Sequence, residues 1–152
     1  MLIEKEKCTG CGACSNICPI NCIDMVSDNE GFLYPSIDLN NCTNCGRCEK
    51  TCPVINEKKS ENNPQPPAYA AWSLDEDIRL NSTSGGIFSE LAKKIISDGG
   101  YVAGAIYNAK HLVEHCIIDD NDGIVLLRQS KYVQSSSGNI YKEVKEILNK
   151  DK

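Results

Sequence analysis

Ten cysteines in a chain of 152 residues constrain its fold more than any other feature. Nine of them lie between Cys8 and Cys52, and only Cys116 lies beyond. Such a density predicts either disulfides or metal sites. The N-terminus reads Met-Leu-Ile-Glu-Lys, which is not a signal-peptide core, so we expect a cytoplasmic protein. Thiols stay reduced in the cytoplasm, and clustered cysteines there are more often metal ligands.

The cysteines form two strings with the same spacing, offset by 34 residues at every position. The strings are Cys8-x-x-Cys11-x-x-Cys14-x-x-x-Cys18-Pro19 and Cys42-x-x-Cys45-x-x-Cys48-x-x-x-Cys52-Pro53. This is the spacing of the bacterial ferredoxin run that binds 4Fe–4S clusters. Three thiolates two residues apart on a loop reach three corners of one cluster. The fourth lies on the following segment and, in two-cluster ferredoxins, ligates the other cluster.

We therefore predict two 4Fe–4S clusters with crossed ligation. The first cluster takes Cys8, Cys11, Cys14 and Cys52, and the second takes Cys42, Cys45, Cys48 and Cys18. Glycines between the ligands permit a positive φ, which brings backbone N–H groups near the sulfides. They are Gly10, Gly12 and Gly46.

Cysteines also bind zinc, and a free cysteine also packs in a hydrophobic core. A pair of four-cysteine zinc sites also uses C-x-x-C. Zinc seldom needs three evenly spaced cysteines and a Cys-Pro, so the iron–sulfur interpretation is favoured. Cys22 falls outside both strings, at a position where a small apolar residue would pack beneath a cluster. We expect it in the core and not among the ligands.

Residues 1–56 resemble the bacterial two-cluster ferredoxin module, a βαββαβ-like duplicate. The expected elements are a first strand at 2–4, a helical turn within 14–18, a hairpin of 22–26 with 32–34, and a weak last strand after Pro53. The fold class is therefore α+β, with a small α/β unit after this module. A polar segment with three prolines at 57–67 reads as a linker.

Residues 68–152 lack the cysteine strings and are predicted to form a small α/β domain. Apolar periodicity predicts a helix between Ser84 and Gly99 with Ile87, Phe88, Leu91, Ile95 and Ile96 on one face. Ser84 is its expected N-cap, and Gly99-Gly100 its expected stop. The other expected elements are strands at 69–72, 101–107 and 112–119, a short helix within 122–129 and a last helix at 138–149.

Two polar strings in this part are candidate anion sites. Ser84, Gly85 and Gly86 precede a helix, where N–H groups bind phosphate, although plain capping explains them equally simply. Lys131 lies in a polar stretch and would pair with a phosphate or a flavin ring, unless the stretch is only a solvated loop.

The order of three strings resembles the coenzyme F-420 hydrogenase/dehydrogenase beta-subunit family. The strings begin at Ala70, Ser82 and Ser130, and the resemblance covers about residues 68–149. It implies a flavoprotein that moves electrons between iron–sulfur clusters, FAD and often a deazaflavin. The residues that it places near the flavin are Ser84, Gly85, Gly86, Lys131 and Tyr132. That family continues further, so the chain resembles an N-terminal part, with FAD expected only in a longer form.

The sequence thus predicts iron–sulfur electron transfer within or to a flavin-linked oxidoreductase, with no catalytic acid or base. The alternative is a stand-alone ferredoxin with a partner-docking domain. A net charge of −5 without a basic block argues against nucleic acid and favours a redox protein or flavoprotein partner with a basic patch. The longest apolar run, 101–107, is too short for a membrane span. The edge of the strands at 101–107 and 112–119 predicts self-association.

Overall fold

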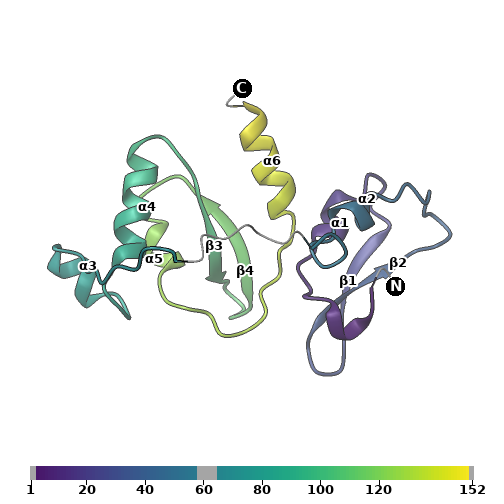
Figure 1. The fold of residues 1–152 in the computed structure, drawn as a ribbon, viewed down its shortest axis with the longest axis horizontal. Helices are drawn as coiled ribbons and strands as arrows, with labels where there is room; N and C mark the ends of the chain where they lie inside the picture. Colours follow the sequence, from purple (N-terminus) through teal and green to yellow (C-terminus); the bar gives the residue numbers. More distant parts are fainter. Residues whose placement is uncertain (1–2, 58–64, 151–152) are drawn as a thin grey trace. The chain divides into compact units, whose positions relative to one another are not determined.

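The computed structural model describes residues 3–57 and 65–150. The chain forms two compact units, the first from Met1–Lys59 and Ser136–Lys152, and the second from Ser60–Ser135. The fold is mixed α+β with two small antiparallel sheets, as predicted (Figure 1). Most of the predicted linker, residues 58–64, lies outside the described residues.

The first unit is built around the antiparallel hairpin that the sequence predicts. Ile23 pairs with Ile37 and Ser27 with Leu33. The Asp28 carboxylate closes the turn by accepting hydrogen bonds from the N–H groups of Glu30 and Phe32. The elements are η1 (Lys5–Lys7), α1 (Ala13–Ile17), β1 (Ile23–Ser27), β2 (Leu33–Ile37), α2 (Arg47–Thr51) and α6 (Ile140–Lys150).

The two outer strands of the expected βαββαβ pattern are not formed. Leu2 is outside the described residues, while Ile3 and Glu4 lead directly into the 3-10 helix η1. Residues 53–56 form turns. There the Asn56 side-chain amide donates to the carbonyls of Glu49 and Cys52, which holds the chain against α2 and prevents an extended run.

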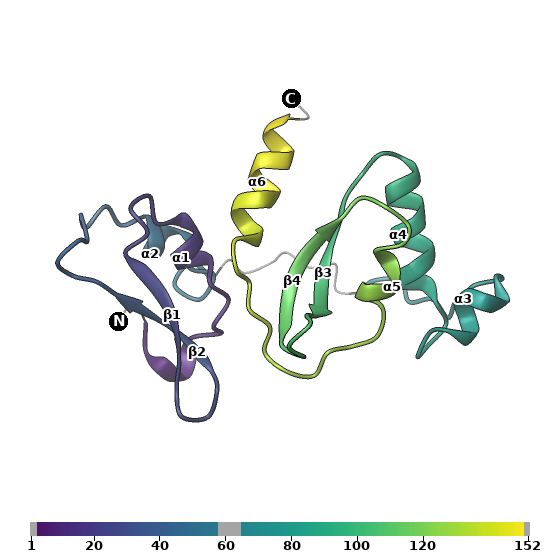
Figure 2. The same cartoon turned by 180° about the vertical axis from the view of Figure 1, so that it is seen from behind.

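The second unit packs two helices against a two-stranded sheet (Figure 2). Its elements are α3 (Glu76–Leu80), α4 (Ile87–Ser97), β3 (Val102–Tyr107), β4 (Val113–Ile118) and α5 (Ile124–Leu127). The sheet runs in register from Val102 with Ile118 to Tyr107 with Val113, and both strands lie where the sequence predicts them. Ala92, Val102, Ile124 and Leu127 form the buried core.

The strand predicted at 69–72 is wrong, and the helix α3 was not predicted. Residues 66–73 have no regular structure, because their backbone follows the Ser84–Gly86 turn. There Ser73 N–H donates to the Gly85 carbonyl, 2.6 Å away. The helix α3 begins at an N-cap, where the Asp75 carboxylate accepts from Ile78 N–H.

The helix α4 is present as predicted, but its cap and its buried face differ. Its N-cap is Gly86, with φ 80°, and not Ser84. Ser89 and Ala92 are buried against the sheet and α5, while most of the predicted core face is exposed. The exposed apolar residues are Phe88, Leu91 and Ile95. The small side chains lie inward because α4 approaches α5 and β3 closely.

The last helix, α6, is present, but it packs in the first unit and not with the rest of 68–152. It contacts α1, and the Asn16 amide nitrogen donates to the Gly138 carbonyl at 2.8 Å. Of its predicted core face, Ile140 is buried, whereas Val144 and Leu148 are exposed. Contacts with α1, which is distant in the sequence, determine where this helix packs. An apolar periodicity predicts a helix but not its packing partner.

Candidate metal centre

The two cysteine strings share one backbone conformation as well as one spacing. Gly12 has φ 72° and ψ 3°, and Gly46, which follows 34 residues later, has φ 70° and ψ 4°. Both glycines are helix N-caps and require the left-handed region that glycine favours. Asn44 takes the place of Gly10 with φ 53° against 65°. Asparagine tolerates this region, so the sequence repeat is also a structural repeat.

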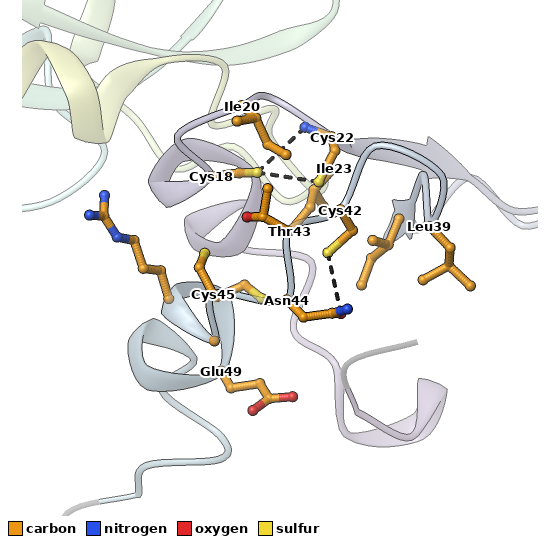
Figure 3. A pocket seen from close by; sticks show the side chains of 14 residues that line it. Cys18, Ile20, Cys22, Ile23, Leu39, Cys42, Thr43, Asn44, Cys45 and Glu49 are labelled. Carbon is orange, nitrogen blue, oxygen red and sulfur yellow. Dashed lines mark hydrogen bonds between the residues drawn. The ribbon is translucent and has the colours of Figure 1, made fainter.

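Four cysteines from both strings surround a cavity of about 180 Å³ (Figure 3). We call this group site two; it consists of Cys18, Cys42, Cys45 and Cys48. Cys18 comes from the end of the first string, and the other three come from the second string. Cys22 also lines the cavity.

The remaining four string cysteines line a second, smaller cavity of about 20 Å³. We call this group site one; it consists of Cys8, Cys11, Cys14 and Cys52. Three come from the first string, and Cys52 comes from the end of the second. The structure therefore brings together the two sets of thiols that crossed ligation requires.

The donors in each site fit a 4Fe–4S cluster, which is held by four cysteine thiolates. All ten cysteines lie in the described part of the chain, and each is a thiol. Among the described residues, no three His, Cys, Asp or Glu side chains converge on one ion position. A cuboidal cluster binds each thiolate through a different iron, so its ligands surround a volume.

Cys22 lies against Cys18 in the buried core of the first unit. The two sulfur atoms are 3.5 Å apart, and Cys22 N–H also donates to Cys18 Sγ at 3.4 Å. Burial raises the pKa of Cys18, but hydrogen bonds from the backbone and from the Cys22 thiol outweigh it and lower the pKa overall. Burial and the neighbouring Cys18 raise the pKa of Cys22. Cys22 packs with Cys18 and Ile23 in this core.

Burial dominates at two other string cysteines, so their pKa is raised overall, whereas that of Cys18 is lowered. Burial raises the pKa of Cys14 to about 11, and it also raises the pKa of Cys48. These thiols hold their protons near neutral pH in the absence of metal. Metal binding must displace those protons, so assembly of a cluster becomes more favourable as pH rises.

Only some residues of the candidate anion site in the second unit lie together in the structure. Ser84, Gly85 and Gly86 line a cavity of about 380 Å³. Lys131 instead donates to the carbonyl oxygens of Leu126 and Arg128, at 3.0 and 2.7 Å. Tyr132 is 92% exposed and lines none of the cavities described here.

Sequence reasoning missed a cation in that cavity. Arg128 lines it, and its Nε donates to Ser89 Oγ at 2.9 Å. Ser89 is 1% exposed and lies on α4 within one turn of the N-cap Gly86. The bond orients the guanidinium, and positions 89 and 128 are too far apart in the sequence for a motif to reveal it.

Two family models match the chain, and both describe a 4Fe–4S dicluster domain. One matches residues 7–56, and the other matches residues 38–119, more than half of the chain. The chain belongs to the 4Fe–4S dicluster domain family. It carries two 4Fe–4S clusters and acts in iron–sulfur electron transfer. This finding sets aside the zinc alternative.

Both clusters of this dicluster protein must come from the two strings, since Cys116 is the one cysteine after Cys52. No curated protein is significantly similar to the chain. The family matches do not link it to the F-420 hydrogenase beta-subunit family. None of the helices in the described residues is long and apolar enough to cross a membrane.

Proposed function

We propose that this dicluster protein passes electrons to or within a flavin-linked oxidoreductase, with the first cluster on site one and the second on site two. The observation that carries the ligand assignment is the grouping of the thiols. Each cavity draws three cysteines from one string and the fourth from the other. Each fourth cysteine ties the two halves of the unit together.

Each cluster, when bound, accepts and releases one electron. The chain's own residues hold and tune this chemistry and transfer no proton. The four thiolates of each site bind the irons, and the loops at Gly12 and Gly46 present backbone N–H groups. The Cys22 backbone N–H donates to Cys18 Sγ at 3.4 Å, which stabilises negative charge there.

The cavity at the start of α4 supports the link to a flavin. The N-terminus of this 11-residue helix carries a partial positive charge, which favours a phosphate. Glycine is required at position 85, because a Cβ there would lie 2.4 Å from the Ala71 carbonyl oxygen. Arg128 supplies the cation that we first expected from Lys131. Tyr132 remains a candidate for the flavin ring.

The alternative is a stand-alone ferredoxin whose second unit docks a redox partner. The observation that favours it is the exposed apolar face of α4, formed by Phe88, Leu91 and Ile95. In this alternative the cavity binds no flavin. In either case the proposed partner is a redox protein with a basic patch, and we propose a cytoplasmic location.

Anaerobic reconstitution with iron and sulfide tests the electron-transfer proposal. We expect about eight irons and eight sulfides per chain and the visible and EPR spectra of 4Fe–4S clusters. An FAD titration followed by fluorescence quenching then separates the two alternatives. We expect weak binding that Arg128→Ala weakens about tenfold and Lys131→Ala leaves unchanged. Equal losses in both variants would contradict the assignment of Arg128, and no binding at all would favour the docking alternative.

A further inference from the structure

The two cysteine strings have the same backbone but different surroundings. A Cβ added to Gly12 would lie 2.1 Å from Ser137 Oγ, whereas one added to Gly46 would meet nothing within 4 Å. Gly12 is buried and Gly46 is partly exposed. The chain near Ser137 therefore lies directly on the loop of site one at Gly12, and the corresponding position Gly46 in the loop of site two has no such contact.

Asn16 holds this segment in place. Its Nδ2 donates to two carbonyl oxygens, that of Gly12 at 3.1 Å and that of Gly138 at 2.8 Å. Two acceptors around one nitrogen fix the orientation of the amide. The Oδ1 atom is then buried without a hydrogen-bond partner. Burial of an oxygen without a hydrogen bond lowers the stability of the folded state. The two hydrogen bonds that Nδ2 donates offset this loss.

The equivalent position in the second string carries no such contact. Lys50 lies 34 residues after Asn16, on α2, and is exposed, whereas Asn16 is 8% exposed. A further bond, from Lys142 Nζ on α6 to Asn21 Oδ1 at 3.0 Å, ties the segment to the chain after α1. Among the loop ligands, Cys11 is partly buried and its counterpart Cys45 is exposed, whereas Cys18, the fourth ligand of site two, is buried and its counterpart Cys52 is partly buried.

We propose that residues 136–150 form a cover over site one, and that Asn16 is the positioning residue that holds this cover. The cover lies on the ligand loop of the first cluster at Gly12, and the ligand loop of the second cluster at Gly46 has no such contact. The two clusters therefore differ in the environment of their ligand loops and in reduction potential, although their ligand spacings are the same. This proposal rests on the ligand assignment of the proposed function.

Hydrogen exchange of α6 in the full-length holo protein provides the first test, with Gly12→Ala as the variant and Gly46→Ala as its control. Both substitutions impose the same backbone strain, because the two φ angles are 72° and 70°. Only the first forces a Cβ into Ser137. We expect exchange of the α6 amides to rise about tenfold in Gly12→Ala and to stay at the wild-type rate in Gly46→Ala. Equal exchange in the two variants would overturn the cover.

Release of iron to a chelator provides the second test, with Asn16→Ala and its counterpart Lys50→Ala. We expect two phases of cluster loss in the wild type. Asn16→Ala should accelerate the slow phase about tenfold, whereas Lys50→Ala should change neither phase. An EPR-monitored potentiometric titration should show that Asn16→Ala shifts one midpoint potential and leaves the other unchanged.

The outcomes separate this proposal from the proposed function. A chain that takes up no iron would contradict the proposed function. A chain with two intact clusters, one phase of loss and no difference between Asn16→Ala and Lys50→Ala would contradict only the cover. Unchanged hydrogen exchange in β1 and β2 shows that Asn16→Ala has kept the fold of the unit, and Lys142→Ala serves as a second variant if it has not.

Discussion

The two units of the chain have cores of different chemistry. In the first unit Cys18, Cys22 and Ile23 form the buried hydrophobic cluster, and other cysteines pack against it. In the second unit Ala92, Val102, Ile124 and Leu127 fill the core, with further aliphatic residues around them. Ligands thus occupy positions in the first unit that aliphatic side chains occupy in the second.

The two units therefore have different sources of stability. A thiol contributes less apolar area than an isoleucine or leucine, and each thiolate of site one or site two gains most of its stabilisation from iron. Metal binding in such a site is coupled to folding. The second unit gains its stability from burial of apolar area and needs no metal.

Removal of iron should have the largest effect and should act on one unit only. Anaerobic chelation is expected to unfold the first unit, because its four-thiol sites then lose their cross-links. Hydrogen exchange should show loss of protection in β1 and β2 and unchanged protection in β3 and β4. Equal loss in both hairpins would show that the second unit depends on the clusters too.

Replacement of Cys18 by Ala should remove one cluster, although Cys18 belongs to the first string. The cluster lost is the one held by Cys42, Cys45 and Cys48, and the iron content should fall by about half. Cys22→Ala is the matched control, since its side chain touches Cys18 without belonging to either site. Loss of a cluster in Cys22→Ala would show that it is a ligand.

Truncation of Ile124 should destabilise the second unit without loss of iron. Ile124 is 1% exposed, and Ile124→Ala leaves a cavity that costs about 2–5 kcal/mol of unfolding free energy. The control Val125→Ala, at a position 59% exposed, should cost far less. Denaturant-dependent hydrogen exchange in β3 and β4 measures both variants. A fall in iron content would mean that the units are not energetically independent.

The smallest effect is expected at the surface ion pair between Lys5 and Asp28, which are 2.8 Å apart. The bond to Asp28 raises the pKa of Lys5 above 10.5, and the bond to Lys5 lowers the pKa of Asp28 below 3.8. The pair therefore stabilises the folded state between these two pH values. Its contribution is lost as pH rises through the raised pKa of Lys5 or falls through the lowered pKa of Asp28.

The loss of this stabilisation can be measured at alkaline pH, because the clusters are destroyed in acid. The difference in denaturation midpoint between wild type and Lys5→Met should persist at neutral pH and disappear above the raised pKa of Lys5. Methionine keeps an apolar stem near the Tyr34 ring, over which the Lys5 ammonium lies at 4.7 Å. A difference that is independent of pH would indicate a packing effect of the stem.

Much of the first unit was predictable because its signals are local. Two hydrophobic segments around Asp28 and Gly31 predict the hairpin, and the two strings predict the turns and short helices beside it. The outer strands were predicted from the resemblance to ferredoxins and are absent at residues 3–4 and 53–56. The Asn56 side chain, bonded to Glu49 and Cys52, decided the second case.

Less of the second unit and its cavity was predictable. The strands β3 and β4 follow from apolar runs on either side of Asn108, whose carboxamide accepts the N–H groups of Lys110 and Leu112 in the turn. The inward side of α4 was assigned to its large apolar residues, and in the structure Ser89 and Ala92 lie there. Lys131 was predicted as the cation and Arg128 was not, because sequence order does not show which cation lines the cavity at the α4 N-terminus.

The cluster chemistry follows from the sequence, because each string places three thiols, separated by two residues, within covalent reach of one cluster. The sequence also determined the repeated backbone, since Gly12 and Gly46 occupy equivalent positions. The tertiary structure alone decided which half is covered. That difference depends on Asn16 and Gly138, which are 122 residues apart and joined by one hydrogen bond of 2.8 Å. A repeat in the sequence specifies equal ligands, but contacts between distant segments specify the environment that each set of ligands receives.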